Sequence, residues 1–141
     1  MDDEVKFHWS EGMKFAVEGM KLLFLLNGAA TISVLTFIGN NKLKSLPLII
    51  SMGCFAVGAA VVIPALFFAY LTQLHYGNAI RTETAHSSKW AEGVRFHYGV
   101  YWAVAIGLLF FLVGVTFAGY GLLGSVTGIE NATPITPPSA P

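Results

Sequence analysis

The chain has 141 residues, of which 55% are hydrophobic and only 11% are charged, and its formal net charge is zero. Soluble domains carry about 25% charged residues, so a water-facing globule of this composition could not cover its surface with charge. The neutral balance argues against nucleic-acid binding, and the one cysteine, Cys54, excludes an internal disulfide and a thiolate metal cluster. We therefore predict an all-α membrane protein with three transmembrane helices, which carry helical extensions on the cytoplasmic side.

Residues 1–21 are predicted to form an amphipathic helical stem. Apolar residues recur at the spacing of one helix face, and the charged residues of the segment alternate in sign on the opposite face. No proline interrupts the chain before the first apolar run, which favours a stem continuous with that run over a helix lying flat on the membrane. The residues expected to pack inside the stem are Trp9 and Met13.

The first predicted span, residues 22–39, carries a polar group in its middle. Asn27, Ala30 and Thr31 fall on one helix face at the spacings i, i+3 and i+4. A polar side chain is costly when it faces lipid, whereas small residues let helices approach closely. Two interpretations remain, a polar site that lines a path through the bundle or an interhelical hydrogen bond between two spans. We favour the hydrogen bond because no ionisable residue accompanies Asn27.

The second predicted span, residues 46–71, holds about 26 residues without a charge, more than the roughly 20 that cross a bilayer. Only a short turn separates it from the first span, so the two form an antiparallel hairpin. Ala56 and Ala60 have the four-residue spacing that allows close helix packing. Pro64 removes one backbone hydrogen bond and predicts a kink, either a hinge or a tolerated bend.

A polar connection, residues 74–98, follows and is expected to turn near 82–88. Beyond the turn, Trp90, Val94 and Tyr98 repeat the spacing of the apolar face of the amino-terminal stem. Both stems lie on the same side of the membrane, which predicts that their apolar faces pack in a short helical bundle.

The third predicted span covers residues 99–123 and brings Ala103 and Gly107 to a spacing suited to close contact. After it, residues 124–141 are rich in proline and poor in large apolar groups, so we predict a disordered tail.

The distribution of Lys and Arg predicts the orientation. Three spans place the amino terminus and the 74–98 connection on one side, and the 40–46 turn and the tail on the other. Positive charges concentrate on the cytoplasmic side of membrane proteins. The first side carries Lys6, Lys14, Lys21, Arg81, Lys89 and Arg95, and the second carries Lys42 and Lys44. We expect a bacterial inner-membrane protein with a cytoplasmic amino terminus and a carboxyl terminus outside.

Candidate chemistry is sparse. His75 and His97 are the candidates for haem or metal binding, since imidazole ligates both. Each has an aromatic neighbour at the expected membrane surface, where amphipathic rings are common, so we expect no cofactor. The sequence shows no nucleophile–base pair, carboxylate pair or nucleotide-binding loop, and we predict that the protein is not an enzyme.

The run LLFLLNGAA at residues 22–30, with the three-span plan, resembles small uncharacterised bacterial inner-membrane proteins. That resemblance implies no activity. The three-span haem-anchor subunits of respiratory complexes are similar in size and topology, but their histidines lie within the spans and none does here.

Three functions follow in order of preference. The first is a non-enzymatic membrane protein that assembles in the lipid bilayer as a homo-oligomer or with a larger membrane-protein partner. The second is a holin-like, channel or transporter protein, although such proteins usually place an ionisable residue inside a span. The third is a haem-bearing membrane anchor.

Overall fold

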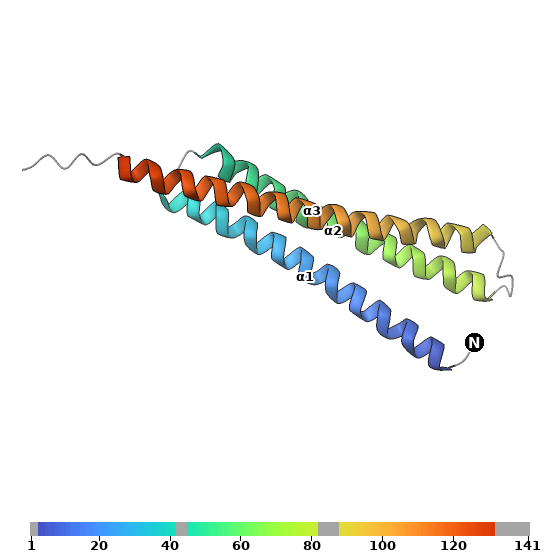
Figure 1. Ribbon diagram of the computed structural model, residues 1–141. Coiled ribbons are helices and arrows are strands. Elements are labelled where there is room, and N and C mark those ends of the chain that lie inside the picture. Colours follow the sequence, from blue (N-terminus) through green and yellow to red (C-terminus); the bar gives the residue numbers. More distant parts are fainter. Residues whose placement is uncertain (1–2, 42–44, 82–87, 132–141) are drawn as a thin grey trace, which may run out of the picture.

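A computed structural model describes three stretches of the chain, residues 3–41, 45–81 and 88–131. They form three helices (Figure 1): α1 (Asp3–Asn41), α2 (Leu46–Arg81) and α3 (Ser88–Asn131). Each helix is long and apolar enough to cross a membrane. The predicted all-α fold with three transmembrane helices is therefore confirmed.

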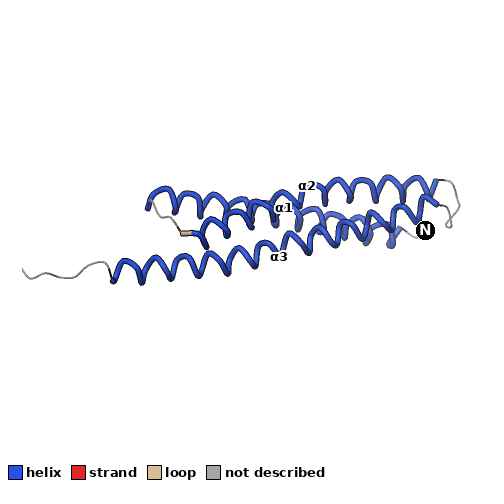
Figure 2. Tube along the Cα trace, turned by 90° about the horizontal axis from the view of Figure 1, so that it is seen from above, coloured by secondary structure: helices blue, strands red, loops and turns tan. Residues whose placement is uncertain are grey.

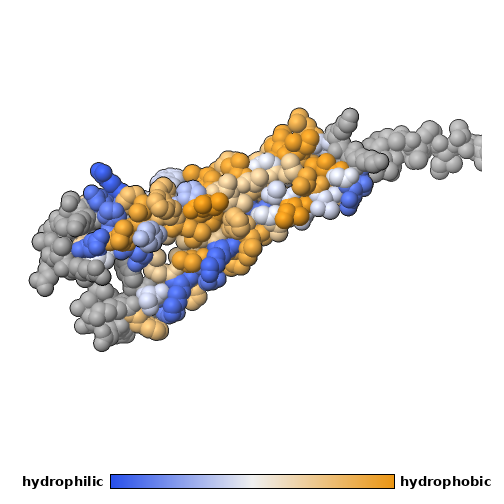
Figure 3. All heavy atoms as spheres, turned by 180° about the vertical axis from the view of Figure 1, so that it is seen from behind, coloured by the Kyte–Doolittle hydropathy of each residue, from blue (hydrophilic) through white to orange (hydrophobic). Residues whose placement is uncertain are grey.

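The helices are longer than a bilayer is thick. They contain 39, 36 and 44 residues, and at 1.5 Å per residue they measure about 54 to 66 Å against a hydrocarbon core of about 30 Å. The start of α1, the end of α2 and the start of α3 lie together at one end of the bundle, here called the stem end (Figure 1). Apolar side chains cover the middle of the molecule, and hydrophilic ones gather toward the ends and along α1 (Figure 3).

The predicted elements differ from the observed helices mainly in extent. The first stem is continuous with the first span, because α1 runs unbroken to Asn41. Most of the 74–98 connection is helical, since α2 ends at Arg81 and α3 begins at Ser88. The tail predicted as disordered is helical as far as Asn131, and residues 132–141 lie outside the described part. The turn itself, residues 82–87, also lies outside it.

The contact surface of α2 repeats every seven residues. Its buried positions alternate spacings of three and four along the helix: Leu48, Ser51, Phe55, Gly58, Val62, Ala65, Ala69, Thr72, Tyr76 and Ala79. A repeat of 3.5 residues is the pattern of left-handed coiled coils, in which the seam stays turned toward the neighbour. The seam of α2 thus faces its neighbours from one end of the helix to the other.

The matching surface of α3 is built on glycine. Gly93, Gly107, Gly114 and Gly121 are separated by multiples of seven residues, and all four are buried. A Cβ atom built at Gly93, Gly114 or Gly121 would lie 2.6 Å from the side chain of Tyr76, Phe55 or Leu48, respectively. Large side chains of α2 therefore rest directly on the backbone of α3, and the two antiparallel helices pack closely over most of their length.

Helix α1 is the outlying element. Its buried residues Met20 and Leu23 join a core cluster with Val62, Ala65 and Ala69 of α2 and with Ala103 of α3. Toward its amino terminus α1 diverges from the α2–α3 pair (Figure 1), and the three helices lie in one bundle when viewed at right angles (Figure 2). Contact between α1 and α3 is slight, so α1 is held to the bundle mainly by α2.

Candidate functional site

Asn27 lies at the point where the three helices meet. Its side chain is 0% exposed. The amide nitrogen Nδ2 donates a hydrogen bond to the carbonyl oxygen of Leu23, at 3.0 Å, and Thr31 Oγ1 donates to the carbonyl oxygen of Asn27, at 2.9 Å. Oδ1 has no hydrogen-bond partner among the described residues. A strong acceptor is thus enclosed in the interior with its lone pairs unused.

Two glycines make the space that Asn27 occupies. A Cβ atom at Gly107 would lie 3.4 Å from the carbonyl oxygen of Gly58, and one at Gly58 would lie 3.2 Å from that of Gly107. The same Cβ atom at Gly58 would overlap Oδ1 of Asn27. The backbones of α2 and α3 are therefore close together where α1 inserts the side chain of Asn27, and only glycine at residue 58 leaves room for it.

Asn27 makes no hydrogen bond to another helix within the described ranges, in contrast to the predicted interhelical bond. The amide bonds to its own helix instead, because the group facing it across the helix contact is the glycine backbone, whose amide and carbonyl already belong to the α2 ladder. Its oxygen can make only a weak Cα–H···O contact there. Ala30 and Thr31, on the same face of α1, are half-buried.

The other residues predicted for intramembrane packing divide into two groups. Ala103 and Gly107 are buried at the contact between helices. Ala56, Ala60 and Pro64 are exposed, because the 3.5-residue seam of α2 passes on its other side. The backbone of α2 continues as helix through Pro64.

The stem end joins the helices through polar and aromatic contacts. Met13 Sδ accepts a hydrogen bond from Gln73 Nε2 at 3.2 Å. The ring of Trp90 packs on Tyr76 with centroids 4.7 Å apart, and Val94 is half-buried. Tyr98 is 61% exposed, so its predicted place in the packed face is wrong. The seam of α3 turns Gly93 inward and leaves residue 98 pointing outward. The side chain of Trp9 lies outside the described residues.

The two candidate histidines each have a neighbour within the chain. His75 Nδ1 lies 3.0 Å from Glu92 Oε2, which links α2 to α3, and its ring stacks on Phe96 at 5.2 Å. His97 Nε2 lies 3.1 Å from the hydroxyl of Tyr101. In the described ranges, no three His, Cys, Asp or Glu residues are grouped so that they could hold a metal ion.

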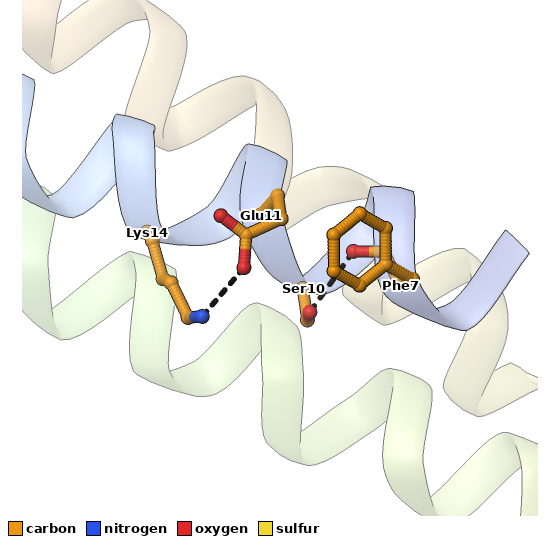
Figure 4. A network of polar contacts seen from close by, with 4 residues as sticks. All are labelled: Phe7, Ser10, Glu11 and Lys14. Carbon is orange, nitrogen blue, oxygen red and sulfur yellow. Dashed lines mark hydrogen bonds and ion pairs between the residues drawn. The ribbon is translucent and has the colours of Figure 1, made fainter. Parts of the chain in front are cut away.

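The charged side chains of α1 form ion pairs within that helix. Lys14 Nζ lies 2.5 Å from Glu11 Oε1, near a hydrogen bond from Ser10 to the carbonyl oxygen of Phe7 (Figure 4). Two turns further on, Lys21 Nζ lies 2.7 Å from Glu18 Oε1. Ion pairs this exposed contribute under about 1 kcal/mol.

Comparisons of the chain with protein-family models, curated proteins and solved structures gave no match. The arrangement itself is one of helix packing around a buried amide. Sequence reasoning paired Ala103 with Gly107 but missed the seven-residue recurrence of glycine in α3. That recurrence is visible in the printed sequence and would have identified the contact face.

Proposed function

We propose that the protein is a non-enzymatic membrane subunit that assembles, with a second copy or a larger membrane protein, through the exposed face of α2. The observation that carries this proposal is the second small-residue stripe of that helix. Gly53, Ala56 and Ala60 alternate spacings of three and four, as the inner seam does, yet all are exposed. A Cβ atom at Gly53 would meet nothing within 4 Å.

The way this chain packs its own glycines supports the proposal. At Gly114 and Gly121, where a small residue faces a neighbouring helix, a large side chain fills the space above it. The outer stripe has the same spacing with that space empty. Small residues at four-residue spacing lower the closest distance between two membrane helices, and the resulting van der Waals contact drives association.

The burial of Asn27 favours assembly over transport. Carriers and channels place polar or ionisable groups along a path. The amide of Asn27 is 0% exposed and so does not contribute a polar surface to such a path. As part of the same proposal, the stem end lies in the cytoplasm and the membrane is a bacterial inner membrane. The excess of Lys and Arg on the stem side supports this orientation.

The test is the size of the protein purified in mild detergent, measured by native mass spectrometry with light scattering. Ala56→Leu combined with Ala60→Leu should raise the dissociation constant of the assembly at least tenfold, because the added side chains hold the partner helix away. Ala91→Leu combined with Ala105→Leu, the same enlargement at two exposed residues of α3, should leave it intact. A wild-type chain that is monomeric and binds no other membrane protein would contradict the proposal.

A further inference from the structure

Helix α3 carries two exposed aromatic residues on one face, separated by five helical turns. Trp102 and Tyr120 are both 69% exposed. They are 18 residues apart, which is five turns at 3.6 residues per turn, so their side chains leave the helix in nearly the same direction. At 1.5 Å per residue, their Cα atoms lie about 27 Å apart along the helix. This separation matches the hydrocarbon core of a bilayer, which is about 30 Å thick.

The segment between the two rings is suited to lipid. It contains no charged residue, and its one hydroxyl, Thr116 Oγ1, donates a hydrogen bond to the carbonyl oxygen of Leu112 at 3.0 Å. Tyr and Trp rings have an apolar body and a polar tip, and they are enriched at both membrane–water interfaces. Trp102 and Tyr120 therefore enclose a stretch of α3 that hydrocarbon can surround.

Helix α2 presents an aromatic ring at the level of the stem-side boundary. Gly99 packs on Phe68, since a Cβ atom at residue 99 would lie 3.2 Å from the Phe68 ring. Tyr70, two residues further toward the stem end, is therefore level with this part of α3. Its side chain is exposed, as are those of Tyr98 and Tyr101. Two helices thus present amphipathic rings at one depth.

Helix α1 places an ion pair at the same level. Met20 lines a cavity together with Tyr101, so it lies beside this part of α3. Glu18 and Lys21, on either side of Met20 in the sequence, are exposed and paired. Residues 22–41 contain no charge. A charged group in the hydrocarbon is costly, which favours the headgroup region for this pair.

The opposite boundary is also shared by two helices. A Cβ atom at Gly121 would lie 2.6 Å from the side chain of Leu48, so the first turn of α2 lies level with Tyr120. In the sequence, Lys44 comes two residues before the start of α2. The charge-free part of α2 therefore begins at the depth that Tyr120 marks.

We propose that Trp102 and Tyr120 lie at the two surfaces of the bilayer, where their rings contact lipid headgroups. The exposed tyrosines at the stem end share the surface marked by Trp102. The spacing selects lipid as the partner of this face of α3, because a protein partner would not require two rings one hydrocarbon thickness apart. The inference does not depend on the proposed assembly, which uses the exposed face of α2.

This placement sets the depth of the other features. Phe111, nine residues from each ring, lies at the centre of the bilayer, where it packs on Phe55. At the stem end, α2 continues beyond Tyr70 to Arg81, about 16 Å further along its axis. The contact between His75 and Glu92 therefore lies outside the hydrocarbon, in the part of the stem that water reaches.

The experiment measures the depth of a single tryptophan in the membrane. Trp9→Phe with Trp90→Phe leaves Trp102 as the one tryptophan of the full chain. This protein is reconstituted in vesicles of palmitoyl-oleoyl phosphatidylcholine, with a share of the lipid brominated either near the headgroup or near the end of the acyl chain. The shallow bromine should quench the fluorescence more strongly. The ring should lie about 13 Å from the bilayer centre, half of the separation along α3.

Leu109→Trp with Trp102→Phe, in the same background, is the matched control. Residue 109 is two turns from Trp102 on the same face and is 58% exposed. Its new ring should lie about 10 Å deeper, and the deep bromine should quench it more strongly. Tyr120→Trp with Trp102→Phe should return to the depth of Trp102, in the opposite leaflet. If Leu109→Trp does not fold, Leu112→Trp, also at an exposed residue, replaces it.

Equal depths for the rings of Trp102 and Leu109→Trp would overturn the proposal. So would a Trp102 ring that neither bromine quenches, which is the result expected if another protein covers this face of α3.

Discussion

At the scale of single residues, the contact of Asn27 with Gly58 decides how close three helices can come. The amide satisfies one donor within α1 and leaves Oδ1 against the Gly58 backbone. Oδ1 of Asn27 would also lack a hydrogen-bond partner if it faced lipid. Its burial against the glycine backbones therefore adds little to the free-energy cost of the unpaired oxygen. The residue that cannot change is therefore the glycine, while the amide is replaceable.

We expect Gly58→Ala to destabilise the protein by about 1–3 kcal/mol, the usual cost of overpacking, because its Cβ atom would overlap Oδ1 of Asn27 and crowd the Gly107 carbonyl. Reversible unfolding in mixed detergent micelles measures the change. Asn27→Ala in the same chain should restore part of the loss, since it removes one of the two obstacles.

Gly77→Ala is the matched control on the same helix, because a Cβ atom there meets nothing within 4 Å. It should leave stability unchanged or raise it by up to about 1 kcal/mol through helix propensity. Equal effects of the two substitutions would mean that α1 does not insert Asn27 at the α2–α3 crossing.

At the scale of whole helices, α2 and α3 form the rigid pair and α1 is an addition to it. Bulky residues of α2 lie over glycines of α3 from one end to the other, from Tyr76 over Gly93 to Leu48 over Gly121. Phe55, in between, also packs on Phe111 with ring centroids 5.7 Å apart. Because these contacts recur in a fixed register, they resist sliding of α2 along α3. A single close contact between the two helices would allow such sliding.

Gly114→Ala should loosen this pair, because its Cβ atom would lie 2.6 Å from the ring of Phe55. The ring can move only by giving up its place beside Phe111, so we expect a loss of about 1–3 kcal/mol. Phe55→Leu should recover part of it. The measurement is thermal unfolding followed by circular dichroism.

Gly119→Ala tests the same helix five residues further on, where a Cβ atom has no neighbour within 4 Å. Its melting temperature should match or exceed that of wild type. The close-packing interpretation fails if Gly114→Ala is as stable as Gly119→Ala.

At the scale of the molecule, the antiparallel arrangement of the helices leaves two possible orientations across the membrane. The start of α1 and the α2–α3 end share the stem end, and α3 ends on the opposite side (Figure 1). The two possible orientations differ only in which side faces the cytoplasm. Six Lys or Arg residues lie on the stem side of the sequence and two on the other.

We predict that the stem end is cytoplasmic. Alkaline phosphatase fused after Pro141 should be active in bacterial cells, since this enzyme matures only outside the cytoplasm, and a green fluorescent protein at the same site should be dark. Fusions at the amino terminus should give the reverse pattern. Bright fluorescence from the carboxyl-terminal fusion would refute the orientation.

The sequence alone determined the number of spans and the continuity of the first stem. These depend on the length of each apolar run and on uninterrupted helix spacing, which are local properties compared with a fixed bilayer thickness. It also located Asn27, Ala103 and Gly107 as residues of the interior, because a polar or small residue within an apolar helix is unusual wherever the helix lies.

Only the tertiary structure decided which face of each helix turns inward. Helix α2 carries small residues on two sides, Gly58 on one and Ala56 with Ala60 on the other, and its own periodicity does not distinguish them. Helix α3 decides which side of α2 turns inward, because its glycines, separated by multiples of seven residues, accept the large residues that lie on the same seam of α2 as Gly58. The same fit turns Tyr98 outward and leaves Asn27 without its expected bond, since both depend on atoms that α2 and α3 bring together from far apart in the chain.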